Sequence, residues 1–454
     1  MIQEIFAPDP AAAGILRKQS AAENAELRPS IFQFPFEHRG GCYLYQSLTK
    51  QCLQVDPALF QAAREPEALL SPEDRRFLTE HWFLVPAEKD ETALFEGLQR
   101  LLRLRTARSR PSGFTILTTT ACNARCFYCV ERGMPAVTMS PETVEATVAH
   151  ILRSRDRAHK VHLRWFGGEP LAAPQVIDRI SEALTGAEVD FDAAMISNGI
   201  LIDEKTMEKM RGPWRIRRLQ ITLDGPEEEY NRRKNYRAAY PSAWRELLAV
   251  LRRLSETPIA VVLRCNVDRD NADGLGRMLE ELAAALPKKD RFYLYFTPLY
   301  AQKESTEHAA LFRRCLEAKV LARDLGFPYA PTAPLHRFRH TLCMAENPFG
   351  SQVISPEGLL FNCDMMPAGS SCGSVREGIA RPELLQRFAR PEPVAARCRD
   401  CPYLTSCTSF TGCPVKPLQC RQVRKLELLY DLRCELDKGE KKGEAPEETP
   451  ELIC

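Results

Sequence analysis

The sequence contains no apolar run approaching the roughly 18 residues of a membrane-spanning helix. Its first residues, Met1-Ile2-Gln3-Glu4, do not resemble the start of a signal peptide. It also lacks an excess of either charge, because 62 Lys and Arg residues against 60 Asp and Glu residues leave a formal net charge of +2. This balance argues against a broad nucleic-acid-binding surface. We therefore expect a cytoplasmic protein with neither a membrane nor a nucleic acid as a partner.

Histidine is scarce, with 8 residues in 454, whereas cysteine is plentiful, with 17. Because the cytosol keeps thiols reduced, a disulfide framework is a poor interpretation of these cysteines, and metal or cluster ligation is a better one. Eight of them fall between residues 343 and 420. The length of the chain favours two or three domains.

One short segment, residues 122–129, carries three cysteines with CxxxCxxC spacing, Cys122, Cys126 and Cys129. Three thiolates are one ligand fewer than a closed zinc site or a four-iron cluster takes. A cluster held in this way has one iron open to a small molecule. The alternative is a structural zinc site completed by one of the nearest histidines, His150, His159 and His162.

The middle of the sequence alternates between strand-like and helix-like segments six times. The strand-like segments are residues 114–118, 161–166, 193–197, 219–223, 259–267 and 292–297. The helix-like segments are residues 141–153, 175–184, 203–210, 242–255, 272–286 and 304–325. Such alternation predicts an α/β fold with a parallel sheet and right-handed crossovers. We interpret residues 112–330 as a partial (βα)6 TIM-like barrel.

Polar residues follow these strands at the edge where such folds carry their chemistry. Gly167-Gly168-Glu169-Pro170 follows the second strand, and its two glycines permit a close backbone approach to a ligand. Ser197-Asn198-Gly199 follows the third strand and Asp224-Gly225-Pro226 the fourth, and the fifth carries Arg264 and Asn266. Each could be an ordinary turn, but together at one edge they indicate a ligand site.

The cysteine segment and the Gly167-Gly168-Glu169-Pro170 segment closely resemble the radical S-adenosylmethionine (SAM) enzymes over residues 112–330. The resemblance implies a [4Fe–4S] cluster on Cys122, Cys126 and Cys129 whose open iron binds the amino and carboxylate groups of SAM. It also implies a 5′-deoxyadenosyl radical that abstracts hydrogen from the substrate. The residues that it assigns to SAM are Gly167, Gly168 and Glu169 for the methionyl amino group, Tyr128 for adenine, and Ser197 and Arg264 for the carboxylate and ribose.

A second cysteine group, Cys398-x2-Cys401-x5-Cys407-x5-Cys413, resembles the SPASM domain of radical SAM enzymes that modify peptides. The resemblance implies two auxiliary [4Fe–4S] clusters, although the family usually has three residues rather than five between the last two cysteines. The ligands implied for the outer cluster are Cys398, Cys401, Cys407 and Cys420, with Cys434 competing for the last place. Those implied for the inner cluster are Cys343, Cys363 and Cys413, with Cys372 as the fourth unless that iron stays open to a substrate thiolate. Paired knuckles of this kind also bind zinc.

Asp364 directly follows Cys363. In the similar sulfatase-maturing enzymes an aspartate at the matching place is the general base that acts on the substrate. A carboxylate beside a cluster would have its charge set by that site. The alternative is a helix cap or a surface carboxylate.

The flanking segments complete the expected organisation of the chain. We expect an N-terminal arm at 1–29, a small α+β domain at 30–95, a linker helix at 96–111, the SPASM domain at 331–436 and a disordered tail at 437–454. The small domain has a strand pair at 42–45 and 51–55 and a helix at 72–81 that Ser71 is placed to cap. It resembles the winged-helix-like, peptide-recognition domains fused to maturases of ribosomally made peptides (RiPPs), and a plain packing domain is the alternative.

These features together predict a radical SAM peptide maturase with SAM and three [4Fe–4S] clusters as cofactors. We expect it to form a thioether on a precursor peptide that carries a leader, with electrons from a donor such as flavodoxin or ferredoxin. One alternative is a sulfatase-maturing enzyme that oxidises Cys or Ser to formylglycine, although it would not need some 110 residues before the cysteine segment. The other is a non-catalytic zinc-binding scaffold.

Overall fold

The computed structural model of the chain comprises two compact units. The residues that it describes are 2–16, 26–65, 70–107, 109–237, 240–299, 305–329, 335–338, 344–347, 349–365, 369–389, 394–407 and 424–440. Unit 1 comprises Met1–Ala107, Pro331–Cys343 and Pro391–Ala445, and unit 2 comprises Arg108–Ala330, Met344–Arg390 and Pro446–Cys454.

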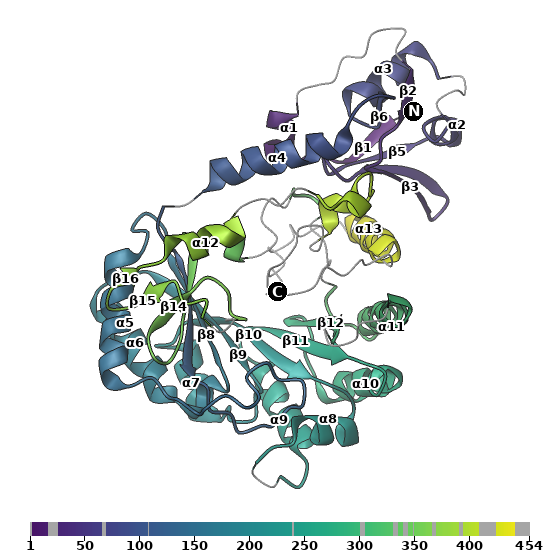
Figure 1. The fold of residues 1–454 in the computed structure, drawn as a ribbon. Helices are drawn as coiled ribbons and strands as arrows, with labels where there is room; N and C mark the ends of the chain where they lie inside the picture. Colours follow the sequence, from purple (N-terminus) through teal and green to yellow (C-terminus); the bar gives the residue numbers. More distant parts are fainter. Residues whose placement is uncertain are drawn as a thin grey trace. The chain divides into compact units, whose positions relative to one another are not determined.

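Unit 2 is built on a ten-stranded mixed sheet (Figure 1). Its strand order is β12 (Phe292–Pro298), β11 (Ala260–Val267), β10 (Ile216–Leu223), β9 (Phe191–Ser197), β8 (Val161–Gly167), β7 (Gly113–Thr119), β13 (Ser351–Ile354), β14 (Leu359–Phe361), β15 (Gly373–Ser374) and β16 (Gly378–Ile379). The strands from β7 to β12 pair in parallel, and β13 joins β7 in parallel. All six predicted strands are present with small shifts at their ends, so the carboxyl ends of successive strands meet at one edge.

Helices connect the parallel strands and cover the outer face of the sheet in Figure 1. They are α5 (Pro141–Ser154), α6 (Pro174–Gly186), α7 (Glu204–Arg211), α8 (Glu227–Lys234), α9 (Ala243–Leu254), α10 (Leu275–Ala285) and α11 (Ser305–Asp324), and α12 (Pro382–Ala389) comes later in the chain. In α9 the apolar residues Leu247, Val250, Leu251 and Leu254 are buried, as a helix lying on a sheet requires. Ser242 begins this helix by accepting a hydrogen bond from the Arg245 N–H at 3.2 Å.

Unit 1 contains a four-stranded antiparallel sheet in the order β1 (Ile2–Phe6), β5 (Gln51–Val55), β4 (Gly41–Gln46) and β3 (Gln33–His38). It also contains the strand pair β2 (Leu27–Pro29) and β6 (Leu84–Pro86), and the helices α1 (Pro10–Ile15), α2 (Pro57–Ala62), α3 (Pro72–Glu80), α4 (Glu91–Thr106) and α13 (Arg424–Glu440). Ser71 caps α3 as predicted, because its Oγ accepts the Asp74 N–H at 3.0 Å.

Three expectations about the flanking segments differ from the structure. The arm expected at residues 1–29 contains β1, α1 and β2, and β1 pairs with β5 from Ile2 to Phe6. The linker helix expected at 96–111 begins earlier, at Glu91, and its Phe95, Leu98 and Leu102 are buried in a core of unit 1. The tail expected from residue 437 overlaps the end of α13.

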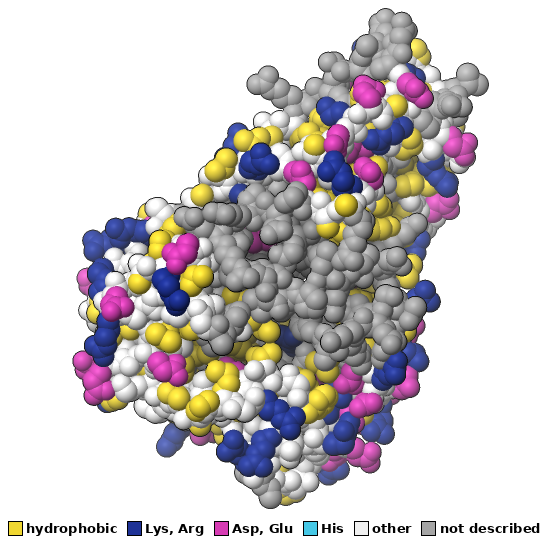
Figure 2. Space-filling view, in the orientation of Figure 1, with side chains coloured by type: hydrophobic (Ala, Val, Ile, Leu, Met, Phe, Trp, Pro, Cys, Tyr) yellow, Lys and Arg dark blue, Asp and Glu magenta, His cyan; other side chains and the backbone are white. Residues whose placement is uncertain are grey.

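Charged side chains of both signs are interspersed over the face of the molecule shown in Figure 2. No helix within the described ranges is both long and apolar enough to cross a membrane.

Candidate functional site

The cysteine loop, residues 120–130, leaves the carboxyl end of β7 and carries the three predicted cluster ligands. Cys122 and Cys126 are half-buried and Cys129 is exposed. The Ala124 N–H donates to the Cys122 Sγ at 3.4 Å, which holds the first turn of the loop. Burial raises the pKa of the Cys122 thiol to about 11, and the charges of Glu169, Cys126 and Cys129 also raise it. The three thiols and Glu169 therefore share one electrostatic environment.

Gly167 and Gly168 let the end of β8 cross the start of the cysteine loop in backbone contact. Gly167 has a φ of +117°, and a Cβ there would lie 2.2 Å from the Thr119 carbonyl oxygen. At Gly168 a Cβ would lie 2.4 Å from the Ala121 carbonyl oxygen. The Gly168 N–H donates to the Thr119 carbonyl and the Glu169 N–H to the Ala121 carbonyl, both at 2.9 Å. These glycines thus serve a contact between two chain segments as well as any approach to a ligand.

Glu169 is fully buried and joins three segments at the edge of the sheet. Its Oε1 accepts hydrogen bonds from the Leu171 N–H at 3.0 Å and the Ser197 hydroxyl at 2.9 Å. Its Oε2 accepts the Asn198 N–H at 2.8 Å. Burial raises the pKa of Glu169 to about 7, although these hydrogen bonds act in the opposite direction. The structure therefore brings Glu169 and Ser197 together, as the prediction required.

Two residues of the segment 123–131 that sequence reasoning missed carry buried polar atoms. Asn198 Nδ2 donates to Asn123 Oδ1 at 2.7 Å and lies 4.0 Å from the Cys122 Sγ. The Asn123 Nδ2 and both carboxylate oxygens of Glu131 are buried and have no hydrogen-bond partner within the described part of the chain. Because buried polar groups are normally satisfied, each of these atoms has the capacity to bond a polar ligand. Their place beside Cys122 and Cys129 in sequence was the available signal.

The donor set of the cysteine loop suits a cluster better than a single ion. A single zinc ion requires its ligands to meet at one point, whereas each thiolate of a four-iron cluster binds a different iron. Over the residues that the structure describes, no three cysteine, histidine or acidic side chains meet at one ion position. The loop nevertheless keeps three thiols in one electrostatic environment beside unsatisfied polar atoms. These residues fit a cluster with an attached polar ligand.

Helix α8, which the sequence analysis did not predict, anchors the cysteine loop. The Arg233 guanidinium donates to both carboxylate oxygens of Asp268, at 3.1 and 2.7 Å, and its carbon lies 4.9 Å from the centroid of the Phe127 ring. The Lys234 carbonyl accepts the Arg125 N–H at 2.9 Å. Three acidic residues in the first turn of α8 and three basic residues in its last turn complement the helix dipole, and this signal could have revealed the helix.

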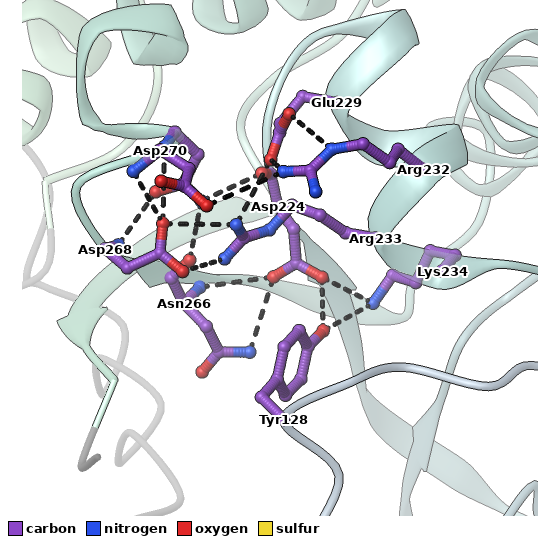
Figure 3. A network of polar contacts seen from close by, with 10 residues as sticks. Tyr128, Asp224, Glu229, Arg232, Arg233, Lys234, Asn266, Asp268 and Asp270 are labelled. Carbon is purple, nitrogen blue, oxygen red and sulfur yellow. Dashed lines mark hydrogen bonds and ion pairs between the residues drawn. The ribbon is translucent and has the colours of Figure 1, made fainter. Parts of the chain in front are cut away.

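The other two residues assigned to SAM are Tyr128 and Arg264. Tyr128 belongs to a polar network at the ends of β10 and β11 (Figure 3), and Arg264 contacts Asn266 of that network. The Tyr128 hydroxyl donates to the Asp224 carboxylate. Asn266 Nδ2 donates to the other oxygen of Asp224 at 3.4 Å, and Arg264 Nε donates to Asn266 Oδ1 at 3.1 Å. Residues from the ends of β10 and β11 therefore meet the cysteine loop through one polar network.

The sequence profile of the radical SAM superfamily matches residues 116–282, which contain all of these contacts. Residues 116–282 form a radical SAM domain. The presence of this domain indicates a radical SAM enzyme. A GTP 3′,8-cyclase from Chlorobaculum tepidum is 33% identical over 92 residues, which are 20% of this chain and 26% of the relative. The chain therefore spans about a quarter of the length of that curated relative.

Solved structures share the fold that surrounds the radical SAM domain. The structure of anSMEcpe with bound AdoMet is 14% identical, has a TM-score of 0.52, and covers 73% of this chain and 100% of that one. Streptococcus suis SuiB bound to precursor peptide SuiA is 12% identical, with a TM-score of 0.50, and covers 87% of this chain and 99% of that one. At these identities the likeness establishes the fold alone.

Asp364, the predicted base, lies beside the sheet of the radical SAM domain. Its carboxylate accepts a hydrogen bond from Arg164 on β8 at 3.2 Å, and the two side chains are 25% and 14% exposed. Arg164 also donates to the Thr115 hydroxyl on β7 at 3.0 Å. Asp364 is therefore neither a helix cap nor an isolated surface carboxylate.

The predicted auxiliary ligands fall in both units. Cys363 and Cys372 belong to unit 2, and Cys372 is buried in its core with its Sγ donating to the Leu360 carbonyl at 3.2 Å. In unit 1, the cysteines beside the core that contains Phe95 and Leu98 are Cys398, Cys401 and Cys407. Cys434 is buried on α13. The predicted ligands outside the described residues are Cys343, Cys413 and Cys420.

The histidines considered as zinc ligands for the cysteine loop are engaged elsewhere. His150 Nε2 lies 2.8 Å from Gln352 Oε1, and His162 Nδ1 lies 2.7 Å from Asp192 Oδ1. His159 pairs with Asp156 at 2.9 Å. None of these contacts involves the cysteines of the radical SAM domain.

Proposed function

We propose that this radical SAM enzyme is a peptide maturase that joins a cysteine sulfur of a precursor peptide to a carbon atom as a thioether. The observation that carries the proposal is which segments of the chain together form unit 1. Its N-terminal strands and helices share a hydrophobic core with residues 398–407, which hold Cys398, Cys401 and Cys407. A domain resembling those that bind leader peptides is thus built together with cysteines spaced for an auxiliary cluster.

The radical SAM domain would supply the cofactor site. Cys122, Cys126 and Cys129 would hold the first [4Fe–4S] cluster, and the chemistry gained with SAM bound is the one-electron cleavage that gives a 5′-deoxyadenosyl radical. The protein contributes the fixed crossing at Gly167 and Gly168 and the buried carboxylate of Glu169, which keep the loop and the ends of the strands in register. Ser197, Tyr128 and Arg264 complete this site in the proposal.

Two auxiliary [4Fe–4S] clusters complete the proposed cofactor set. The outer one would be bound by Cys398, Cys401, Cys407 and either Cys420 or Cys434. The inner one would be bound by Cys343, Cys363 and Cys413. Because Cys372 is buried among apolar side chains and bonded to a backbone carbonyl, we favour an inner cluster whose fourth position is open to the substrate cysteine.

The proposed substrate enters as an extended peptide. In the sheet of unit 1, β1 and β3 are the outer strands, and an outer strand can bind an extended leader by β-augmentation. Structures of the same fold were solved with peptides, anSMEcpe with a Kp18Cys peptide and SuiB with precursor peptide SuiA. Flavodoxin or ferredoxin would deliver the electron. We place the enzyme in the cytoplasm, where thiol ligands stay reduced.

The test is an anaerobic assay of the reconstituted protein with SAM, a reductant and a short cysteine-containing peptide encoded beside its gene. We expect 5′-deoxyadenosine and a product two hydrogens lighter, in which the cysteine no longer reacts with alkylating reagents. A peptide of unchanged mass, with 5′-deoxyadenosine formed, would reject the thioether assignment.

Formylglycine formation is the second candidate, and the ion pair between Arg164 and Asp364 favours it because it holds Asp364 beside the sheet. The assay is repeated with a sulfatase-derived peptide carrying Cys or Ser at the target position. An aldehyde that reacts with hydrazine reagents would support this candidate. Asp364→Asn should then abolish the reaction, whereas thioether formation should survive it.

Metal analysis tests the alternative of a non-catalytic zinc-binding scaffold. Three four-iron clusters predict about twelve iron atoms per chain with matching sulfide and a brown colour. A colourless protein with zinc would reject the catalytic proposal.

A further inference from the structure

A buried ion pair is in contact with the cysteine loop. The Lys234 Nζ is 2.9 Å from the Asp224 Oδ2, and the two side chains are 2% and 0% exposed (Figure 3). The Lys234 ammonium also donates to the Tyr128 hydroxyl at 3.1 Å. Tyr128 lies between two of the cluster ligands in sequence, so the pair is tied to the loop through its side chain.

Lys234 also reaches the loop through its backbone. Its carbonyl accepts the Arg125 N–H at 2.9 Å and lies 4.0 Å from the Cys126 Sγ. Asn235, the next residue, takes the left-handed conformation with a φ of +44° that ends α8. One residue therefore offers the loop both a backbone acceptor and a buried positive charge.

The partners of Asp224 hold the pair in place. Its Oδ1 accepts hydrogen bonds from the N–H and the side chain of Asn266, both at 3.4 Å. Asn271 Nδ2 donates to the Asp224 carbonyl at 2.9 Å. Neighbouring Arg233 is locked to Asp268 by two hydrogen bonds. Neither charge has solvent beside it, so both act on nearby groups with little screening.

We propose that Lys234 and Asp224 are positioning residues that set the reduction potential of the cluster held by Cys122, Cys126 and Cys129. The Lys234 charge favours the reduced cluster, which carries one more negative charge, and the Asp224 charge opposes it. Because the two charges act in opposite directions, the pair holds the potential between the values that either charge alone would give. The inference rests on the proposed function because it needs a cluster on this loop.

The test compares Lys234→Met, Asp224→Asn and the double variant, each reconstituted as full-length protein. The potential is followed by electron paramagnetic resonance, using the signal that changes when SAM is added to separate this cluster from the auxiliary ones. At a fixed solution potential, Lys234→Met should lower the ratio of reduced to oxidised cluster about tenfold, equivalent to about 59 mV for one electron. Asp224→Asn should raise this ratio, and the ratio in the double variant should lie between those of the two single variants.

A purely structural role predicts a different pattern. Loss of packing would shift the potential of both single variants in the same direction, and the shift in the double variant would be larger than in either. That result would overturn the inference. If Lys234→Met does not load iron, the potentials of Asp224→Asn and the double variant are compared instead. The inference then requires a lower potential in the double variant than in Asp224→Asn.

The matched control is the pair of Lys209 on α7 and Asp178 on α6, whose atoms are 2.7 Å apart in the same domain. Lys209→Met and Asp178→Asn should leave the potential unchanged, because within the described residues this pair contacts Trp214 and not the cysteine loop. The outcomes also separate the two proposals. A wild-type protein without a SAM-responsive signal rejects the proposed function, whereas a normal signal with equal potentials in all variants rejects only this inference.

Discussion

At the scale of single residues, Gly168 shows how closely the cysteine loop and β8 are fitted together. We expect Gly168→Ala to lower the iron content after reconstitution and to cost at least about 1–3 kcal/mol of unfolding free energy. The physical reason is that the new Cβ would lie 2.4 Å from the Ala121 carbonyl oxygen, and neither group is a flexible side chain. Iron analysis and urea unfolding measure the two effects.

Gly276→Ala is the matched control for this substitution. Gly276 lies in α10, and a Cβ there would make only an ordinary 3.8 Å contact with Leu321. Alanine should therefore stabilise the protein by about 0.5–1 kcal/mol and leave the iron content unchanged. Equal iron content in the two variants would show that the crossing at Gly168 is not needed for the cluster loop.

The sequence and the structure agree on the positions of Glu169 and Ser197, because the ends of strands can be located from the hydrophobic pattern. Once β8 and β9 were assigned, Glu169 and Ser197 had to lie near each other at the same edge, and the structure places them 2.9 Å apart. Of the Tyr128 partners Asp224 and Lys234, only one could be found in this way. Asp224 follows β10 at the same edge, whereas Lys234 is the last residue of the unpredicted helix α8.

At the scale of elements, α8 serves as the anchor of the cysteine loop. We expect Arg233→Met to cost about 3–5 kcal/mol, because it leaves the buried carboxylate of Asp268 without its cation. Its side chain is 0% exposed and that of Asp268 is 9% exposed. Urea unfolding measures the loss, and hydrogen exchange of the cysteine loop should become faster.

The neighbouring residue supplies the control for Arg233. Arg232 pairs with Glu229 at 2.7 Å, but its side chain is 59% exposed. Arg232→Met should change stability by less than about 1 kcal/mol, because water screens this pair and replaces its contacts. Equal losses in the two variants would mean that α8 acts through its helical structure rather than through the buried pair.

The elements that sequence reasoning missed share a physical cause. Helix α8 has few apolar residues, so its signal lies in the charges at its two ends rather than in a hydrophobic stripe. Strand β1 is recognisable only through its pairing with β5 from Ile2 to Phe6, a contact between distant parts of the chain. Elements with a strong apolar period, such as α9, were located almost to the residue.

At the scale of the whole molecule, the division into two units does not follow the order of the sequence. Residues 391–445 belong to the same unit as the N-terminal domain, whereas residues 344–390 extend the sheet of the radical SAM domain. A continuous SPASM domain at 331–436 was the expectation. Local sequence patterns carry no information on which distant segment will share a core, and the cysteine spacing alone therefore could not predict this division.

This division predicts that the outer auxiliary cluster stabilises the N-terminal domain. Helix α4 touches the segment that holds Cys398 and Cys401, since Thr92 Oγ1 accepts the Asp400 N–H at 3.1 Å and Glu96 accepts the Val394 N–H at 2.8 Å. The variant with both cysteines changed to alanine should retain about eight of twelve irons. Hydrogen exchange should become faster in α4 and stay unchanged in α9, because a ligand that binds only the folded state stabilises the unit that holds it.

Cys42→Ala tests whether this effect is specific to the proposed ligands. Cys42 lies on β4 in the same unit but outside the cysteine motifs, so its loss should leave both the iron content and the exchange of α4 unchanged. Unchanged iron in the Cys398 and Cys401 variant would remove the outer cluster from the proposal. Lost iron with unchanged exchange in α4 would instead show that the apolar cores of unit 1, which include residues of the segment 394–407 and of α13, hold α4 in place without the cluster.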